Sequence, residues 1–386
     1  MPERTLSAIK ADVGSNAGHL TPTDEVVAAI RDHLADAGDV LDDYLVFTVG
    51  DDVDLLLSHT EGEDDDGIHR LAWDAFEAGT AVAEEQGLYG AGQDLLEDAF
   101  SGNVRGLGPG VAEATFEERE SEPILVFGAD KTEPGSFNEP LYTAFADPRY
   151  TPGLLLKDSI HEGFVFEVMD MEHDGDDRVV RLEVPEDAWR LAALLMEPHR
   201  FAVRKVVSRA TGEPVAAIST QRLRNVAGEY VGKDDPVAIV RTQKDFPSPG
   251  EVVQPFAEPP YVGGSMRGSH RGPYYPIGSD PAELPSYFDG PPLVKALGMV
   301  VNDGRFSEPV YPFDSSFWDT VREDTAREFR EFRERQGSFG PGTLGADELE
   351  YGGWTDVVES MDDEWIVDPA GTAGEPTTTE PAADDD

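Results

Sequence analysis

Aspartate recurs at the ends of apolar runs in this sequence, usually close to a glycine. Asp12 follows the run 6–9, Asp130 follows the run 124–127, and Asp234-Asp235 precede the run 237–240. Short apolar runs rich in branched and aromatic residues predict buried strands. Ends of different strands can meet on one face of a fold. The pattern therefore favours a fold in which several strands bring their carboxylates to one place.

A further pair, Asp51-Asp52, lies with Gly50 between the apolar runs 45–49 and 53–57, which predicts a hairpin turn. Carboxylates that converge are costly to bury unless a cation compensates them. With no cysteine in the chain and an oxygen-only ligand set, Mg²⁺ is preferred over zinc. His19 and Gln93 could add neutral ligands. The alternative is that each Asp is an ordinary turn residue in an acidic chain.

One lysine stands out in the segment 228–236. Only seven of the 30 basic residues are lysines, and Lys233 lies between Gly232 and the Asp234-Asp235 pair, three residues after Tyr230. A lysine amine can form a Schiff base with a carbonyl carbon, and a nearby phenol can carry the accompanying proton. The alternative is a solvated loop that enters a buried strand, with Lys233 as a surface charge.

Composition narrows the class of protein. The formal net charge is −48, which disfavours nucleic acid as a partner because phosphate backbones need Lys and Arg. Concentrated salt would screen the self-repulsion of such a surface, so we expect a halophilic cytoplasm. The absence of cysteine excludes disulfides and thiolate metal sites. Residues 1–5 do not resemble a signal peptide, and no apolar run is long enough to span a membrane.

The remaining segments indicate a mixed α/β (α+β) chain. Thr23-Asp24 predicts the start of a helix, residues 69–85, 186–195 and 317–335 predict further helices, and the segment 246–292 reads as a long irregular stretch. The glycine-rich segment 101–110 could wrap a phosphate with backbone N–H groups, and Arg267 with Arg271 could clamp another. For both segments an ordinary surface loop is an equally good reading.

Longer motifs carry a family resemblance. The segments 9–15, 49–52, 88–93, 98–110, 129–135, 230–236, 266–270 and 288–292 resemble the archaeal fructose-1,6-bisphosphate aldolase/phosphatase family, in order and over most of the chain. The resemblance implies a single catalytic domain over residues 1–368, built as a four-layer α-β-β-α sandwich and assembled as a homo-octamer. Residues 369–386 are expected to be a disordered acidic tail.

The resemblance also implies an activity. One active site would condense dihydroxyacetone phosphate with glyceraldehyde 3-phosphate and then remove the C1 phosphate from fructose 1,6-bisphosphate, a gluconeogenic sequence. Two other readings stay open. The first is a Mg²⁺-dependent sugar phosphatase in which Lys233 only binds phosphate. The second is a non-catalytic acidic protein that binds cations for structural reasons.

Position by position, the resemblance implies Lys233 as the Schiff-base lysine and Tyr230 as the proton donor and acceptor of the aldol step. The resemblance also implies that each active site binds several Mg²⁺ ions. The ligands that it implies are Asp12, His19, Asp51, Asp52, Gln93, Asp130, Asp234 and Asp235. The substrate contacts that it implies are His19, Tyr89, Gly102, Asn103, Asp130, Lys131, Thr132, Thr242, Gln243, Arg267, Asp289 and Tyr351.

Overall fold

Strand β1 (Glu3–Asp12) alternates between two apolar layers and so determines how the fold is stacked. Leu6 and Ala8 point into one core, whereas Ile9 and Ala11 point into another. A strand that is buried on both faces requires cover on both sides of its sheet. The computed structural model describes residues 3–17, 20–92, 95, 109–132, 134–171, 178–198, 200–220, 235–259, 262–265, 270–280 and 291–336.

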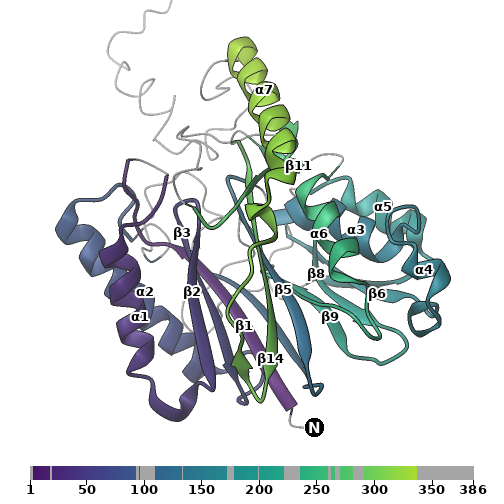
Figure 1. Ribbon diagram of the computed structural model, residues 1–386, viewed down its shortest axis with the longest axis horizontal. Coiled ribbons are helices and arrows are strands. Elements are labelled where there is room, and N and C mark those ends of the chain that lie inside the picture. The colour runs from purple at the N-terminus through teal and green to yellow at the C-terminus, as the bar shows by residue number, and fades with distance from the viewer. Residues whose placement is uncertain are drawn as a thin grey trace, which may run out of the picture.

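The first sheet is antiparallel and has the strand order β2-β3-β1-β4. Its other strands are β2 (Asp43–Val49), β3 (Asp52–His59) and β4 (Gly110–Glu117). Helices α1 (Asp24–Ala35) and α2 (Asp66–Gln86) cover its outer face (Figure 1). The predicted start of α1 is confirmed, because the Thr23 hydroxyl accepts a hydrogen bond from the backbone N–H of Val26.

The second sheet has the strand order β13-β14-β5-β10-β9-β8-β6-β7, with β15 paired to β14. Only the β13–β14 pair in the described part of this sheet is parallel. Its strands are β5 (Glu122–Asp130), β6 (Phe164–Asp170), β7 (Val179–Val184), β8 (Phe201–Ser208), β9 (Pro214–Ile218), β10 (Val237–Arg241), β13 (Tyr275–Ile277), β14 (Leu293–Asn302) and β15 (Arg305–Phe306). Strands β11 (Val262–Ser265) and β12 (His270–Gly272) form a separate pair.

Helices cover the outer face of this second sheet as well. They are α3 (Asn138–Ala146), α4 (Gly153–Leu156), α5 (Ala188–Leu195) and α6 (Pro249–Ala257). The ring of Phe127 on β5 stacks on that of Phe256 on α6, with 3.8 Å between centroids. The last described helix, α7 (Asp319–Gln336), projects from one end of the molecule (Figure 1). None of the helices in the described ranges is long and apolar enough to cross a membrane.

The fold is therefore an α+β sandwich with four layers, helices on the outside and two sheets within, as predicted (Figure 1). Among the described residues, three large apolar cores separate the layers. The middle core lies between the two sheets and contains Leu6 and Leu56 from the first sheet, with Val126 and Ile239 from the second. Two packed sheets with alternating inward residues build such a core.

Toward one end of the middle layer, charged side chains replace the apolar ones. The inward-facing positions that continue the apolar rows are Lys10 and Asp12 on β1, Asp52 and Asp54 on β3, Asp130 on β5 and Lys295 on β14, and all of them are buried. A buried charge is stable only when it is paired, hydrogen-bonded or bound to an ion. This charged end of the middle layer is thus the part of the fold that packing alone does not explain.

Some elements were not predicted from the sequence. The prediction of an irregular stretch over 246–292 was wrong for α6, which begins at Pro249, and for the short strands β11, β12 and β13. The backbone N–H of Ser248 donates to the carboxylate of Glu251 (2.9 Å), a capping contact that starts this helix. Strand β4 and helix α3 were also missed. Residues 369–386 lie outside the described ranges.

Lys295 gives a first prediction. Burial lowers the pKa of its amine from 10.5 to about 8, and its ammonium donates to the carbonyl of Thr48 (2.7 Å) on the other sheet. Between pH 8 and 10.5 the unfolded chain binds more protons than the folded chain, so the free energy of unfolding rises with pH there. At about 1.4 kcal/mol per pH unit, the charged amine costs the fold about 3 kcal/mol near neutral pH.

Lys295→Met removes this cost. We expect the variant to be more stable than the wild type at pH 7, and the difference to shrink as the pH rises from 8 to 10.5. Thermal unfolding of both proteins at fixed KCl across this pH range measures the difference, in which the titration of groups remote from Lys295 cancels. A difference that does not change with pH would contradict the assignment.

Candidate active site

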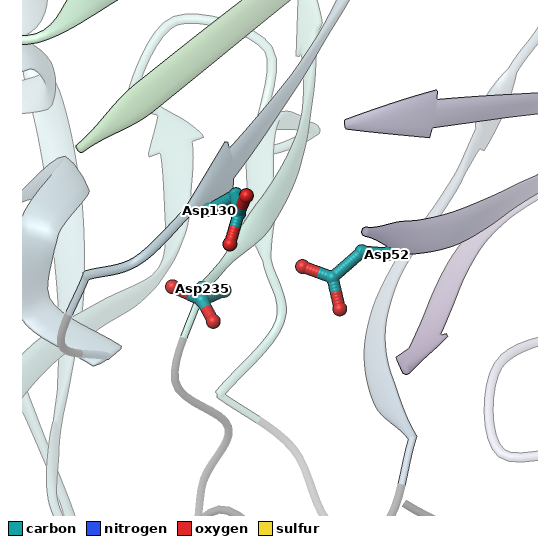
Figure 2. A group of neighbouring side chains, drawn as sticks. All are labelled: Asp52, Asp130 and Asp235. Atoms are coloured by element: carbon teal, nitrogen blue, oxygen red, sulfur yellow. The ribbon is translucent and has the colours of Figure 1, made fainter. Parts of the chain in front are cut away.

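Three carboxylates from both sheets meet at the charged end of the middle layer. They belong to Asp52 at the start of β3, Asp130 at the end of β5 and Asp235 two residues before β10. One oxygen of each lies within 4.8 Å of one oxygen of the other two, and the carboxylates face a common space (Figure 2). Asp52 and Asp130 are each only 3% exposed. Such an arrangement of like charges calls for a cation.

The turn between β2 and β3 permits this approach. Gly50 has a φ of +59°, and a Cβ at this position would lie 1.7 Å from the Asp130 carboxylate. Glycine is the residue that adopts a positive φ without a side-chain penalty. The absence of a side chain here lets the first sheet carry Asp51 and Asp52 against the end of β5.

Two buried lysines partly compensate the carboxylates. The Lys10 ammonium donates to the Asp52 carboxylate and, at 3.3 Å, to the carbonyl of Ala129. The Lys131 ammonium donates to Asp51 (3.0 Å) and to Asp130 (2.5 Å). The first bridge spans β3 and β5, and the second spans the hairpin turn and β5. Both therefore tie the first sheet to the second.

The charges perturb one another strongly. Burial raises the pKa of Asp130 to about 7, helped by Asp51 and Asp235 and opposed by Lys131. Burial lowers the pKa of Lys10 and of Lys131, but the neighbouring carboxylates outweigh it and leave both pKa values above their ordinary value. Both lysines are thus charged at neutral pH, whereas Asp130 titrates near it. A bound metal ion would favour the carboxylate form of Asp130.

Asp235 is held against Thr132. Its carboxylate accepts hydrogen bonds from the backbone N–H and from the hydroxyl (3.3 Å) of Thr132, and its own N–H donates to the Thr132 carbonyl (3.3 Å). Asp235 and Lys131 both have positive φ values, 56° and 61°. A positive φ in a non-glycine residue is held in place by its surroundings and is common at functional sites.

Two other predicted residues lie at the same end of the first sheet. Asp12 is the cross-strand partner of Asp52, and its carboxylate accepts from the backbone N–H of Gly14 (3.2 Å). The backbone of Tyr89 pairs with that of Ser15, just after β1, through hydrogen bonds of 2.9 and 3.2 Å. The fold therefore places Asp12 beside Asp52 and joins the segment that carries Tyr89 to the chain just after β1.

Two predicted substrate contacts are not brought to this place. Thr242 and Gln243 follow β10, whereas Asp235 precedes it, so they lie at the opposite end of that strand. The backbone N–H of Thr242 donates to the carbonyl of Pro123 (3.0 Å) at the far end of β5. The separation along the strand is roughly 25 Å. Within one chain the two residues therefore lie away from the cluster, because a strand separates its two ends, and their contact with a substrate stays a prediction.

The other predicted site residues lie outside the described ranges. They are His19, Gln93, Gly102, Asn103, Tyr230, Lys233, Asp234, Arg267, Asp289 and Tyr351.

The sequence analysis missed the part that Lys10 plays. Lys10 lies two residues before Asp12 on one strand, so both side chains face the same side of the sheet. That spacing could have revealed it.

The chemistry of the cluster fits a hard cation. The three carboxylates of the cluster offer only oxygen ligands, with Asp12 and Asp51 next to them. Mg²⁺ and similar ions prefer carboxylate oxygens, whereas zinc favours His and Cys. The described residues can therefore hold a divalent metal ion at the meeting point of the two sheets.

Known proteins resemble the chain over nearly its whole length. The profile of a family described as fructose-1,6-bisphosphatase matches residues 3–366. The fructose-1,6-bisphosphate aldolase/phosphatase of Thermus thermophilus is 49% identical over 94% of this chain and 99% of its own length. The proteins of the same name from Methanothermobacter marburgensis and Methanocaldococcus jannaschii are 46% and 48% identical, over 93% and 94% of this chain and 98% and 92% of their own lengths. The chain therefore belongs to the fructose-1,6-bisphosphatase family.

Proposed function

We propose that this protein is a bifunctional fructose-1,6-bisphosphate aldolase/phosphatase. It condenses dihydroxyacetone phosphate with glyceraldehyde 3-phosphate and then hydrolyses the C1 phosphate of the product, as in gluconeogenesis. The names of relatives that match over more than nine-tenths of the chain support both activities. The observation that carries the phosphatase half is the convergence of Asp52, Asp130 and Asp235.

The metal in this proposal is Mg²⁺, with several ions in one site. Asp52, Asp130 and Asp235 would hold it together with Asp12 and Asp51, and His19, Gln93 and Asp234 complete the proposed ligand set. Bound Mg²⁺ would polarise the phosphoryl oxygens, position a water molecule and neutralise the leaving oxygen. Lys131 now pairs with Asp51 and Asp130. Once a metal ion neutralised those carboxylates, its ammonium could turn to a substrate phosphate.

The aldol half rests on the segment that precedes β10. Lys233 comes two residues before Asp235 in the sequence, and the proposed Schiff base requires its amine to act beside the carboxylate cluster. The amine would attack the ketone carbon of dihydroxyacetone phosphate and lose water to form an imine. Tyr230, as its phenolate, would then take a proton from the neighbouring carbon, which attacks the aldehyde carbon of the second substrate, and would return the proton to the aldehyde oxygen. Hydrolysis of the imine releases fructose 1,6-bisphosphate.

The remaining proposed contacts surround the substrate phosphates and hydroxyl groups. They are His19, Tyr89, Gly102, Asn103, Thr132, Arg267, Asp289 and Tyr351, and among them Thr132 is the one whose contact with the cluster is described. A cytoplasmic setting in concentrated salt belongs to the same proposal, since a net charge of −48 favours a solution that screens it.

A homo-octamer is the proposed assembly. Large apolar side chains remain exposed on the single chain, among them Leu156 (80%), Phe317 (72%) and Trp189 (71%). Exposed apolar surface of this kind is compatible with contacts between copies. A second copy would also be needed to present Gln243 to the cluster, because within one chain Gln243 lies at the far end of β10.

The direct test of the proposed function follows triose phosphates through to fructose 6-phosphate and inorganic phosphate, at fixed KCl with Mg²⁺ or with EDTA. We expect both products with Mg²⁺ and no phosphate release in EDTA. Phosphate release from fructose 1,6-bisphosphate without any condensation of triose phosphates would mean that the protein is a phosphatase and has no aldolase activity. Full phosphatase activity in EDTA would remove the metal cluster from the mechanism.

The turn at Gly50 gives a prediction about the metal site. Gly50→Ala should push the Asp130 carboxylate away, because the new Cβ would overlap it. We expect the Mg²⁺ concentration for half-maximal phosphate release to rise at least about tenfold. Gly212→Ala is the matched control, since Gly212 also has a positive φ (74°) but a Cβ there would meet no atom within 4 Å. Equal effects of the two substitutions would mean that backbone strain alone is responsible.

Lys233 gives a prediction about the aldol step. Lys233→Arg should reduce condensation by at least about a hundredfold and retain bisphosphate hydrolysis, because only a primary amine forms the imine. Borohydride reduction in the presence of dihydroxyacetone phosphate should label the wild type and not the variant, as read by intact mass. Tyr230→Phe should slow condensation more than hydrolysis. Normal condensation by Lys233→Arg would end the Schiff-base assignment.

The assembly gives a separate prediction. Light scattering after size exclusion in high KCl should give eight times the chain mass of 42.0 kDa. Gln243→Ala should leave this mass unchanged and raise KM for fructose 1,6-bisphosphate. A monomer with full activity would contradict both the octamer and the contribution of a second copy.

A further inference from the structure

Lys10 is a charged side chain that the proposed chemistry does not use. It is fully buried (0% exposed) on β1, beneath the carboxylate cluster and facing the middle layer. Its ammonium donates to the Asp52 carboxylate of the first sheet and to the Ala129 carbonyl (3.3 Å) of the second, one residue before Asp130. It therefore contacts a carboxylate of the cluster and the backbone next to another, from the side away from solvent.

The charges around Lys10 are unbalanced. The described part of the site holds five carboxylates, those of Asp12, Asp51, Asp52, Asp130 and Asp235, and two ammonium groups, those of Lys10 and Lys131. Asp54 adds one more buried carboxylate, and it is the cross-strand neighbour of Lys10. Removing one partner of a buried ion pair leaves an uncompensated charge and is strongly destabilising. When no metal ion is bound, the site therefore depends on its lysines.

We propose that Lys10 is a positioning residue that acts as a permanent internal counter-cation, which holds Asp52 and the end of β5 in place when the metal ion is absent. The inference rests on the proposed function, since it assumes that the cluster binds a divalent ion. Lys10 and that ion partly replace each other, because both neutralise the same carboxylates. They also repel each other, because both are positive.

This arrangement has a consequence of definite sign. Without Lys10, the carboxylates of the metal-free fold lose a compensating positive charge. The affinity for the metal ion rises, because a neighbouring cation that repels it is gone. The metal ion should therefore stabilise a Lys10 variant more than it stabilises the wild type. A lysine with a merely structural role would lower stability by the same amount with and without metal.

The test is thermal unfolding at fixed KCl, in EDTA and in saturating Mg²⁺, without substrate. We expect Lys10→Met to lower Tm in EDTA by roughly 5–10 °C, and Mg²⁺ to restore most of this loss. A titration with Mn²⁺ followed by the EPR signal of the free ion should give a Kd at least about threefold lower for the variant. Lys295→Met is the matched control, because this second buried lysine of the middle layer donates to the Thr48 carbonyl. Its effect on Tm should be the same in EDTA and in Mg²⁺.

A second variant covers the case in which Lys10→Met does not fold. Lys10→Met combined with Asp54→Asn removes one positive and one negative charge, so the net charge of the layer is kept, and the metal-free fold should be recovered in part. Failure of this double variant to fold would overturn the proposal, as would an equal Tm loss with and without Mg²⁺ or a higher Kd for Mn²⁺. If Mg²⁺ does not stabilise the wild type either, the metal site itself fails, which distinguishes the two proposals.

Discussion

Mutual repulsion among carboxylates is the constraint around which this structure is arranged. Oxygens from Asp52, Asp130 and Asp235 lie within 4.8 Å of one another in a site with little exposure to water. Two sheets with an apolar layer between them are needed to bring these residues together, because Asp52 belongs to the first sheet and Asp130 to the second. Burial of the apolar layer supplies favourable free energy of folding. This free energy offsets the cost of holding the carboxylates close together at the charged end of the same layer.

The sequence was informative about this site because strand ends are easy to recognise. Apolar runs with aspartate at one end predicted β1, β3, β5 and β10, and the turn at Gly50 was expected from its hairpin signal. Four of the helices were also anticipated, within a few residues at their ends. Periodicity and turn chemistry are local signals, so they place elements along the chain with some accuracy.

Other features could not be read from local patterns. Strand β4 follows a glycine- and proline-rich segment and contains the buried Glu113, and α6 contains Pro249, Gly250 and Pro255, so both resembled irregular chain. The spacing of Lys10 and Asp12 shows that the two side chains share a face, but it does not show that Lys10 is buried against Asp52, a residue of another strand. The positions of Thr242 and Gln243 depended on which end of β10 faces the cluster, a property of the sheet rather than of the segment.

The bare backbone at Gly50 has one more consequence. Because the Asp130 side chain lies directly against the bare backbone of Gly50, the spacing of the two sheets directly sets the spacing of the carboxylates. The side chains of the middle apolar layer, such as those of Leu56 and Val126, therefore determine the distance between the two sheets at the cluster. A methyl group added or removed in that layer would be transmitted, through close packing, to the geometry of the cluster. Substitutions far from any reacting atom could in this way tune which cation the protein prefers.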